Sequence, residues 1–137
     1  MTLFPLKIVT PDGLKLDGMV QELVVRTTTG DMAVLAGHTN VVAPLGMGQA
    51  MVVVEDGSKR YAACIGGMLS VLNGETTLVA TTYEWAEDID VQRAEASKHR
   101  AEEILTKKGS TDADIKLAEA RMKRALIRTG VAQLRNR

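Results

Sequence analysis

Residues 81–94, TTYEWAEDIDVQRA, contain the point at which the character of the sequence changes. Before this stretch, short apolar runs alternate with turn residues; after it, the chain lacks proline, is rich in alanine and charge, and has helical apolar spacing. Residues 1–87 carry 5 Lys and Arg against 9 Asp and Glu, whereas residues 88–137 carry 12 against 8. A net charge of −4 is thus followed by one of +4, and we expect two units, 1–87 and 88–137.

The first unit has the pattern of an antiparallel β-sandwich. Its runs rich in Val and Thr are short: 6–10, 19–27, 32–35, 49–55, 59–65, 68–72 and 76–83. Turn chemistry separates them, because 10–13 reads TPDG, 55–57 reads EDG, and Asn73-Gly74 suits a two-residue loop with positive φ. The pair Gly66-Gly67 lies between two apolar runs, where it indicates a bulge or a close backbone approach.

The second unit predicts two helices joined by a short link, an antiparallel helical hairpin. Acidic residues at 87, 88 and 90 favour a helix start, and Lys107-Lys108-Gly109 is a typical helix end. Residues 110–112, STD, offer caps for the second helix. The apolar stripes, rich in alanine, are Val91, Ala94, Ala101 and Leu105, then Ile115, Ala118, Met122, Ala125, Thr129 and Ala132. Such a seam buries little area, so the hairpin is either permanently docked or a switch with two states of similar free energy.

Composition argues against several classes of site. The single Cys64 lies in an apolar run, so it is interpreted as a small buried hydrophobe rather than a reactive thiol. His38 and His99 lie on different elements, and no residue set has metal-ligand or nucleophile spacing. No run reaches the roughly 18 apolar residues of a membrane span. Four aromatic residues and a pI near 6.7 do not favour nucleic-acid binding.

Each predicted helix carries a basic stripe. Arg93, Arg100 and Lys107 are seven residues apart on the first, and residues 121, 124, 128 and 135 of the second are all arginine. One reading is a solvated face with local ion pairs, each worth a few tenths of a kcal/mol. The others are a site for a polyphosphate or for an acidic protein surface, and the sequence leaves all three open.

Several ordered segments resemble the epsilon subunit of bacterial F-type ATP synthases over the whole chain. They are VTPDG at 9–13, GDMAVLAGH at 30–38, VAPL at 42–45, GGMLSV at 66–71 and AEDIDVQRA at 86–94. The resemblance implies a mainly β fold with added α structure, a flattened sandwich of about ten strands followed by a regulatory helical hairpin. It also implies a non-catalytic rotor subunit, peripheral on the cytoplasmic face of the bacterial inner membrane. Its implied partners are the gamma subunit, the c ring, and the alpha and beta subunits; the membrane is reached only through the complex.

The resemblance also implies contact residues. Asp31, Gly37 and His38 would face the c ring, and Gly66, Gly67, Met68, Leu69 and Ser70 would lie against gamma. When the hairpin extends along gamma, its basic second helix would meet acidic surface on alpha and beta and block ATP hydrolysis. The candidates for that contact are Arg121, Lys123, Arg124 and Arg128.

The sequence IDVQRA at 89–94 is similar to the nucleotide motif of this family. It implies no required cofactor but makes ATP a candidate regulatory ligand that stabilises the closed hairpin. The adenine would lie among Glu84, Ile89, Asp90 and Ala94, and the phosphates near Arg93, Arg100, Arg124 and Arg128. Capping by Asp90 and ordinary charge pairing are the simpler interpretation. Trp85, unexpected in the linker, should either pack over the hairpin or crowd the adenine. A free-standing nucleotide-binding module is the alternative function.

Overall fold

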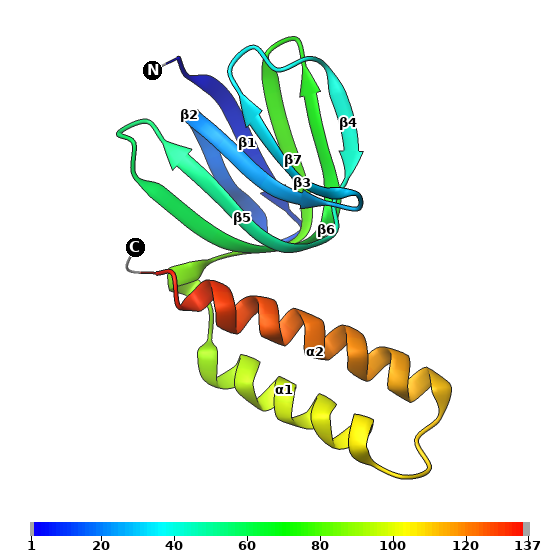
Figure 1. Cartoon of the computed structure of the whole chain (residues 1–137). Helices are drawn as coiled ribbons and strands as arrows, with labels where there is room; N and C mark the ends of the chain where they lie inside the picture. The colour runs from blue at the N-terminus through cyan, green and yellow to red at the C-terminus, as the bar shows by residue number, and fades with distance from the viewer. Residues whose placement is uncertain (1, 136–137) are drawn as a thin grey trace.

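The structure is a computed structural model that describes residues 2–135, and it contains a β-sandwich followed by a helical hairpin (Figure 1). Seven strands are present in the described residues. They are β1 (Phe4–Thr10), β2 (Gly13–Thr27), β3 (Gly30–Leu35), β4 (Val41–Pro44), β5 (Met47–Val54), β6 (Lys59–Leu72) and β7 (Glu75–Trp85). The sandwich and the hairpin expected from the sequence are therefore confirmed.

The long strands β2, β6 and β7 each contribute to both layers of the sandwich. The first layer contains β4, the second half of β6, the first half of β7, β1 and the first half of β2. The second contains β3, the rest of β2, β5, the rest of β6 and the end of β7. Counting the three shared strands twice gives ten strand segments, as expected. The pair β1–β7 is parallel, whereas the others in the described chain are antiparallel.

The turn residues behave as their chemistry predicts. Asn73 and Gly74 have φ values of +51° and +84°, the left-handed conformation of a two-residue hairpin loop. Two strand predictions were wrong. The runs 59–65 and 68–72 form the single strand β6, and the short strand β4 was missed, because alternation alone does not show where a strand passes from one layer to the other.

The core lies between the two layers and consists mainly of aliphatic side chains. Leu6, Ile8, Leu23, Leu69 and Leu78 are fully buried in it. Each belongs to the inward-facing set of an alternating strand, so burial follows from the period-two pattern. Cys64 and Trp85 join the same core. Trp85 thus packs into the sandwich core, which corrects the first of the two arrangements expected for it, packing over the hairpin.

The hairpin begins after a short 3-10 turn, η1 (Ala86–Asp88). Helix α1 (Val91–Thr106) is capped by Asp90, whose side chain accepts the backbone N–H of Arg93. Helix α2 (Asp112–Ala132) is capped in the same way by Thr111. The acidic residues 87 and 88 therefore precede α1, a correction to the predicted start, and α2 continues through Gly130.

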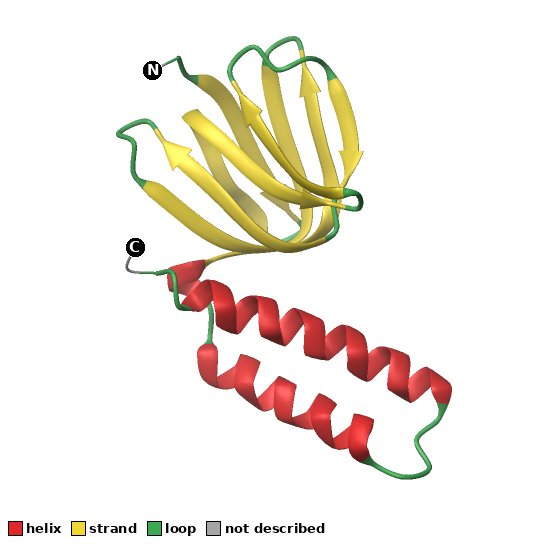
Figure 2. Cartoon of the chain, in the orientation of Figure 1, coloured by secondary structure: helices red, strands yellow, loops and turns green. Residues whose placement is uncertain are grey.

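The helices meet along a seam of alanine, as the sequence predicted. Ala94 and Ala101 of α1 and Ala118 and Ala125 of α2 are buried. Val91 and Leu105, expected on the same stripe, are 37% exposed. Helix α2 lies between α1 and the sandwich (Figure 2) and contacts β5 and β6. The small seam leaves larger apolar side chains of the hairpin open to solvent.

Replacing Gly130 in α2 by alanine should stabilise the protein. A Cβ at this position meets no atom within 4 Å, and its φ is compatible with a helix. Alanine removes conformational freedom from the unfolded chain, so the free energy of unfolding should rise by about 0.5–1 kcal/mol in urea denaturation. The control Gly109→Ala should destabilise, since Gly109 has a φ of +88°. A loss of stability in Gly130→Ala would show that the helix end needs glycine.

Candidate functional site

The outer face of the first layer carries a row of apolar side chains that crosses five strand segments. The register places Pro44 beside Met68, Met68 beside Val79, Val79 beside Val9, and Val9 beside Leu14. We call these five residues the apolar row. Met68, Val79 and Leu14 are 43%, 51% and 58% exposed. Because soluble monomers rarely expose a contiguous apolar surface of this kind, the row has the character of a protein interface.

The segment 66–70 lies where β6 changes partner from β5 to β4. Gly66 and Gly67 have φ values of +74° and +121°, and a Cβ on Gly67 would be 2.0 Å from the carbonyl oxygen of Val79. The close backbone approach predicted for this pair is confirmed. Of the three residues that follow, Met68 is exposed, Leu69 is buried in the core, and Ser70 is half-buried. The exposed side chain of this segment is therefore that of Met68.

The residues expected at a second partner surface are not brought together. Asp31 lies at the start of β3, whereas Gly37 and His38 follow its end, so they lie at opposite ends of one strand (Figure 1). The Oδ1 of Asp31 accepts a hydrogen bond from Nε of Arg26 at 2.5 Å, and this bond holds the pKa of Asp31 below its usual value. His38 is half-buried, and its Nδ1 lies 2.8 Å from the carbonyl oxygen of Thr39.

The hairpin is docked on the outer face of the second layer through a small apolar cluster. Its buried members come from β6, η1, the linker and α2: Ala63, Ala86, Ile89, Val131 and Ala132. Tyr61 and Ile127 pack at its edge. Since most of these side chains are small, the cluster holds the hairpin by only a few kcal/mol, at about 25 cal/mol per Å² of apolar surface.

An ion pair joins the sandwich to the hairpin beside this cluster. Nε of Arg128 on α2 donates to Oε1 of Glu84 on β7 at 2.6 Å, and both side chains are about one-third exposed. The two residues are 44 positions apart in the sequence, so the contact exists only because the hairpin is docked. It is specific to this conformation.

The residues of the predicted nucleotide site are only partly gathered. Glu84 and Arg128 meet in the ion pair, while Ile89 and Ala94 are buried, at 5% and 4% exposure. Asp90 Oδ1 accepts the backbone N–H of Arg93 at 3.0 Å, the geometry of an N-cap. The side chains of Arg93 and Arg100 are exposed and that of Arg124 is half-buried. A base contacting Ile89 would have to displace part of the docked cluster.

The predicted inhibitory surface is available in part. Arg121 and Lys123 on α2 are exposed and Arg124 is half-buried, but Arg128 is held by Glu84. The Nε–H of Arg128 is taken by Glu84, whose charge also offsets that of the guanidinium. The net positive charge of the basic stripe is therefore reduced while the hairpin is docked.

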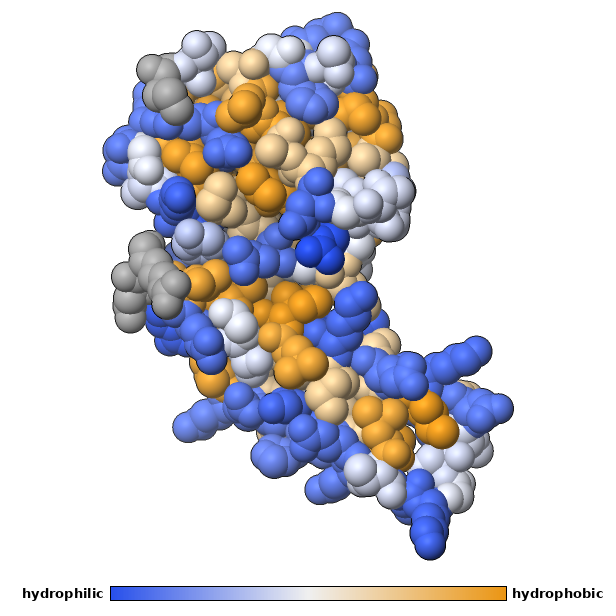
Figure 3. Space-filling model, in the orientation of Figure 1, coloured by the Kyte–Doolittle hydropathy of each residue, from blue (hydrophilic) through white to orange (hydrophobic). Residues whose placement is uncertain are grey.

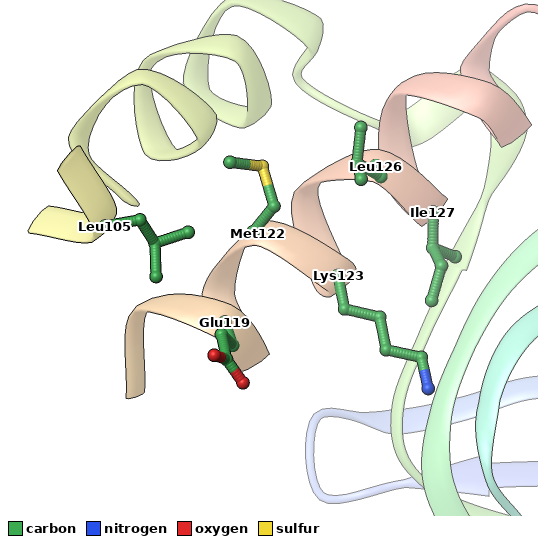
Figure 4. Close-up of a pocket in the computed structure, with 6 residues that line it drawn as sticks. All are labelled: Leu105, Glu119, Met122, Lys123, Leu126 and Ile127. Carbon is green, nitrogen blue, oxygen red and sulfur yellow. The ribbon is translucent and has the colours of Figure 1, made fainter. Parts of the chain in front are cut away.

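An apolar groove of about 390 Å³ lies along the hairpin beside these cations. It is lined by Leu105 of α1 and by residues of α2: Glu119, Met122, Lys123, Leu126 and Ile127. Lys123 and Ile127 point toward the sandwich, whereas Leu105 and Met122 lie near each other on the far part of the hairpin (Figure 4). In Figure 3, hydrophobic residues lie along the hairpin among hydrophilic ones. The docked hairpin thus retains an uncovered apolar surface.

Other kinds of site find little support in the described part of the chain. Within residues 2–135, no three His, Cys, Asp or Glu side chains are grouped to hold a metal. Neither described helix is long and apolar enough for a membrane span. Burial raises the pKa of Cys64 to about 12, which suits the predicted inert thiol. The surfaces that remain are the apolar row and the docked hairpin.

Comparison with known proteins matches both units. The β-sandwich domain of the ATP synthase delta/epsilon chain matches residues 3–86, and the long α-helix domain of the same chain matches residues 87–133. The chain belongs to the ATP synthase epsilon family. It is 44% identical to the ATP synthase epsilon chain of Bacillus velezensis, over 91% of this chain and 93% of that one. It is 37% identical to the epsilon chain of Caldanaerobacter subterraneus, over 94% of this chain and 93% of that one.

Solved structures show the same fold as this epsilon family member. A chain in the cryo-EM structure of the Euglena gracilis mitochondrial ATP synthase superposes with a TM-score of 0.83 at 24% identity, covering 98% of this chain and 82% of that one. A chain in the central stalk and c-ring structure of the Tetrahymena thermophila enzyme gives a TM-score of 0.59 at 15% identity, covering 93% and 95%. At these identities, the likeness concerns the fold.

Sequence reasoning missed three features of this epsilon-type chain. The apolar row was visible only as isolated residues, because its members come from five strand segments whose register no local pattern reveals. The pairs Glu84–Arg128 and Arg60–Glu87 were missed because their partners are 44 and 27 residues apart. The exposed alternate positions of 68–72 could have indicated the row, since Met68 and Leu72 alternate with core residues.

Proposed function

We propose that this chain is a non-catalytic central-stalk subunit of a rotary ATP synthase, which couples the catalytic head to the membrane c ring. The apolar row carries the proposal, because it is an exposed apolar surface that spans five strand segments of the sandwich. The family of its relatives and the central-stalk setting of a structural neighbour support the same role. The subunit would lie at the cytoplasmic face of the bacterial membrane and reach it only through the complex.

The apolar row is the proposed contact with gamma. Met68 lies near its centre and is the exposed side chain of the segment 66–70. The backbone of Gly66 and Gly67 is fixed by close packing, so Met68 is presented from a rigid strand rather than a mobile loop. Asp31 at one end of β3, and Gly37 with His38 at the other, are proposed as separate contacts with the c ring.

Substituting Val79 by aspartate tests the row. Val79 is half exposed at its centre, so the charge should leave the core intact while it opposes desolvation in a partner interface. Calorimetric titration with purified gamma should show binding by the original chain and at least about tenfold weaker binding by Val79→Asp. Leu35→Asp, at a similarly exposed apolar residue on β3, is the control and should bind normally. Equal affinity of Val79→Asp would contradict the assignment. Absence of binding by the original chain would favour a free-standing nucleotide-binding module.

The hairpin is the proposed regulator of ATP hydrolysis. Docked, it leaves rotation free; extended along gamma, it would bring Arg121, Lys123, Arg124 and Arg128 to acidic surface on alpha and beta. The small docking cluster and the Glu84–Arg128 pair support this proposal, because together they give a docked state of modest stability. The groove at Leu105 and Met122 provides apolar surface that a new partner could cover in the extended state.

ATP is the proposed ligand that favours the docked state. Its phosphates would be neutralised by Arg93, Arg100, Arg124 and Arg128, which come from two helices and would have to be brought together by a closed hairpin. Glu84 accepts the Nε–H of Arg128 and offsets its charge, so a phosphate at Arg128 must compete with that carboxylate. This competition should lower ATP affinity relative to a site whose arginines are all free.

Calorimetric titration of the isolated chain with ATP tests this ligand. Arg93→Ala should weaken binding by about tenfold or more, the loss of one charge-assisted contact. Asp90→Asn separates the two roles of Asp90, since asparagine keeps the N-cap but not the charge. Arg26→Gln, in the sandwich, is the control. Either saturable binding that is unchanged in Arg93→Ala or no binding at millimolar ATP would contradict the proposal that ATP is the ligand of this site.

A further inference from the structure

Three side chains meet where the sandwich passes into the hairpin. The guanidinium of Arg60 on β6 lies over the ring of Trp85, 3.7 Å from the ring centroid. The same guanidinium donates from one terminal nitrogen to Oε1 of Glu87 in η1 at 2.8 Å. We call Arg60, Trp85 and Glu87 the linker clamp. It joins a strand, the last residue of the sheet and the linker through two interactions of one cation.

The clamp has a rigid base. Trp85 is only 5% exposed and packs edge-on against the buried ring of Tyr83, with centroids 5.0 Å apart. Its position is therefore set by the sandwich core. Arg60 stacks on this ring, and one of its terminal nitrogens reaches Glu87. Burial is the largest single influence and tends to raise the pKa of Glu87, but the hydrogen bond and charge of Arg60, together with a backbone hydrogen bond, outweigh it, so the net pKa is lowered and the carboxylate is charged at neutral pH.

Fixing Glu87 also fixes the residues beside it in the linker. Ala86 and Ile89 are buried with Val131 and Ala132 of α2 in the docked cluster. Arg60 and Glu87 also line a pocket of about 190 Å³ with Leu134 and Arg135, which follow α2. The position of the clamp therefore affects how the linker places Ala86 and Ile89 against α2.

We propose that the linker clamp biases the hairpin toward the docked state. Arg60 acts as a positioning residue: it holds η1 against the sheet, so that Ala86 and Ile89 meet α2 without further ordering of the linker. Without the contacts of Arg60, the apolar cluster keeps all its residues. The linker, however, must then lose conformational entropy each time the hairpin docks, so docking becomes less favourable. The consequence for ATP hydrolysis rests on the proposed regulatory role, whereas the effect on docking is a property of the isolated chain.

The clamp is tested by single-molecule energy transfer on the isolated full-length chain. Dyes on Glu55→Cys and Lys108→Cys report the distance between the sandwich and the far end of the hairpin, and both sites are exposed. Cys64 is buried with a pKa of about 12 and should stay unlabelled near pH 7. Arg60→Gln should raise the ratio of undocked to docked molecules about fivefold to tenfold. Arg60→Lys should have a smaller effect, because it keeps the charge and loses the planar stacking.

Two further variants keep the test decisive. Glu87→Gln removes only the ion pair and leaves Arg60 on Trp85, so it should raise the same ratio about twofold to fivefold even if Arg60→Gln folds poorly. Arg26→Gln removes the Arg26–Asp31 pair elsewhere in the sandwich and should change nothing. An unchanged ratio in both folded Arg60→Gln and Glu87→Gln would overturn the clamp. The assay contains neither gamma nor catalytic head, so failure of the proposed regulatory function would appear instead in hydrolysis assays of the complex.

Discussion

Removing residues 88–137 should raise ATP hydrolysis by the assembled synthase about fivefold or more while leaving ATP synthesis largely intact. The truncation deletes both helices and with them every candidate inhibitory cation, Arg121, Lys123, Arg124 and Arg128. It leaves β1 to β7 and the apolar row complete, so attachment to the rotor should persist. The small residues that the hairpin covers on β6, such as Ala63, expose little apolar surface when it is gone.

The measurement is the steady-state rate of ATP hydrolysis by purified complexes, compared with the rate of ATP synthesis under an ion gradient. A matched variant keeps the hairpin and replaces Arg121 and Lys123 by glutamine, which removes two exposed cations without touching the Glu84–Arg128 pair. It should give an intermediate rise in hydrolysis. Unchanged hydrolysis in the truncated complex, with the subunit still present, would refute the inhibitory role.

Replacing Gly67 by alanine should lower the free energy of unfolding by about 3 kcal/mol or more. Its added Cβ would lie 2.0 Å from the carbonyl oxygen of Val79 and 2.8 Å from Cα of Ala80, both parts of the β7 backbone. Its φ of +121° is also unfavourable for any residue with a side chain. Neither conflict can be relieved by moving a flexible side chain. The strands β6 and β7 must separate locally or the chain must adopt a different local backbone.

Urea denaturation measures this loss, and Gly18→Ala in β2 is the matched control. A Cβ added to Gly18 would meet no atom within 4 Å, and Gly18 has no positive φ, so its replacement should change stability by less than about 1 kcal/mol. Because Gly67 precedes Met68, the same variant should weaken binding to gamma if the strand shifts. Native-like stability of Gly67→Ala would show that the close approach to Val79 is not a constraint on the fold.

Local chemistry explains which parts of the fold could be predicted from the sequence. The loop at Asn73 and Gly74, the caps at Asp90 and Thr111, and the alanine seam depend on residues within a few positions of one another. Because these interactions are local, the pattern in the sequence is sufficient to predict them. The same reasoning identified Gly66-Gly67 as a close approach without identifying its partner, Val79, which is twelve residues from Gly67.

Long-range register explains what could not be predicted. The apolar row requires β4, β6, β7, β1 and β2 to align at one level, and that alignment includes a parallel pair that no turn specifies. The separation of Asp31 from His38 follows from the direction of β3. The linker clamp depends on Arg60, a residue that carries no motif and is notable only for its position beside Trp85 and Glu87.

The most direct test of the account is the distance between the sandwich and the tip of the hairpin in the assembled synthase. Single-molecule energy transfer between dyes on Glu55→Cys and Lys108→Cys should show two populations, a docked one with the distance of the isolated chain and an extended one. The extended population should dominate when hydrolysis is inhibited and should shrink as ATP is added. A single docked population under every condition, in complexes whose hydrolysis is still inhibited, would contradict control by the hairpin.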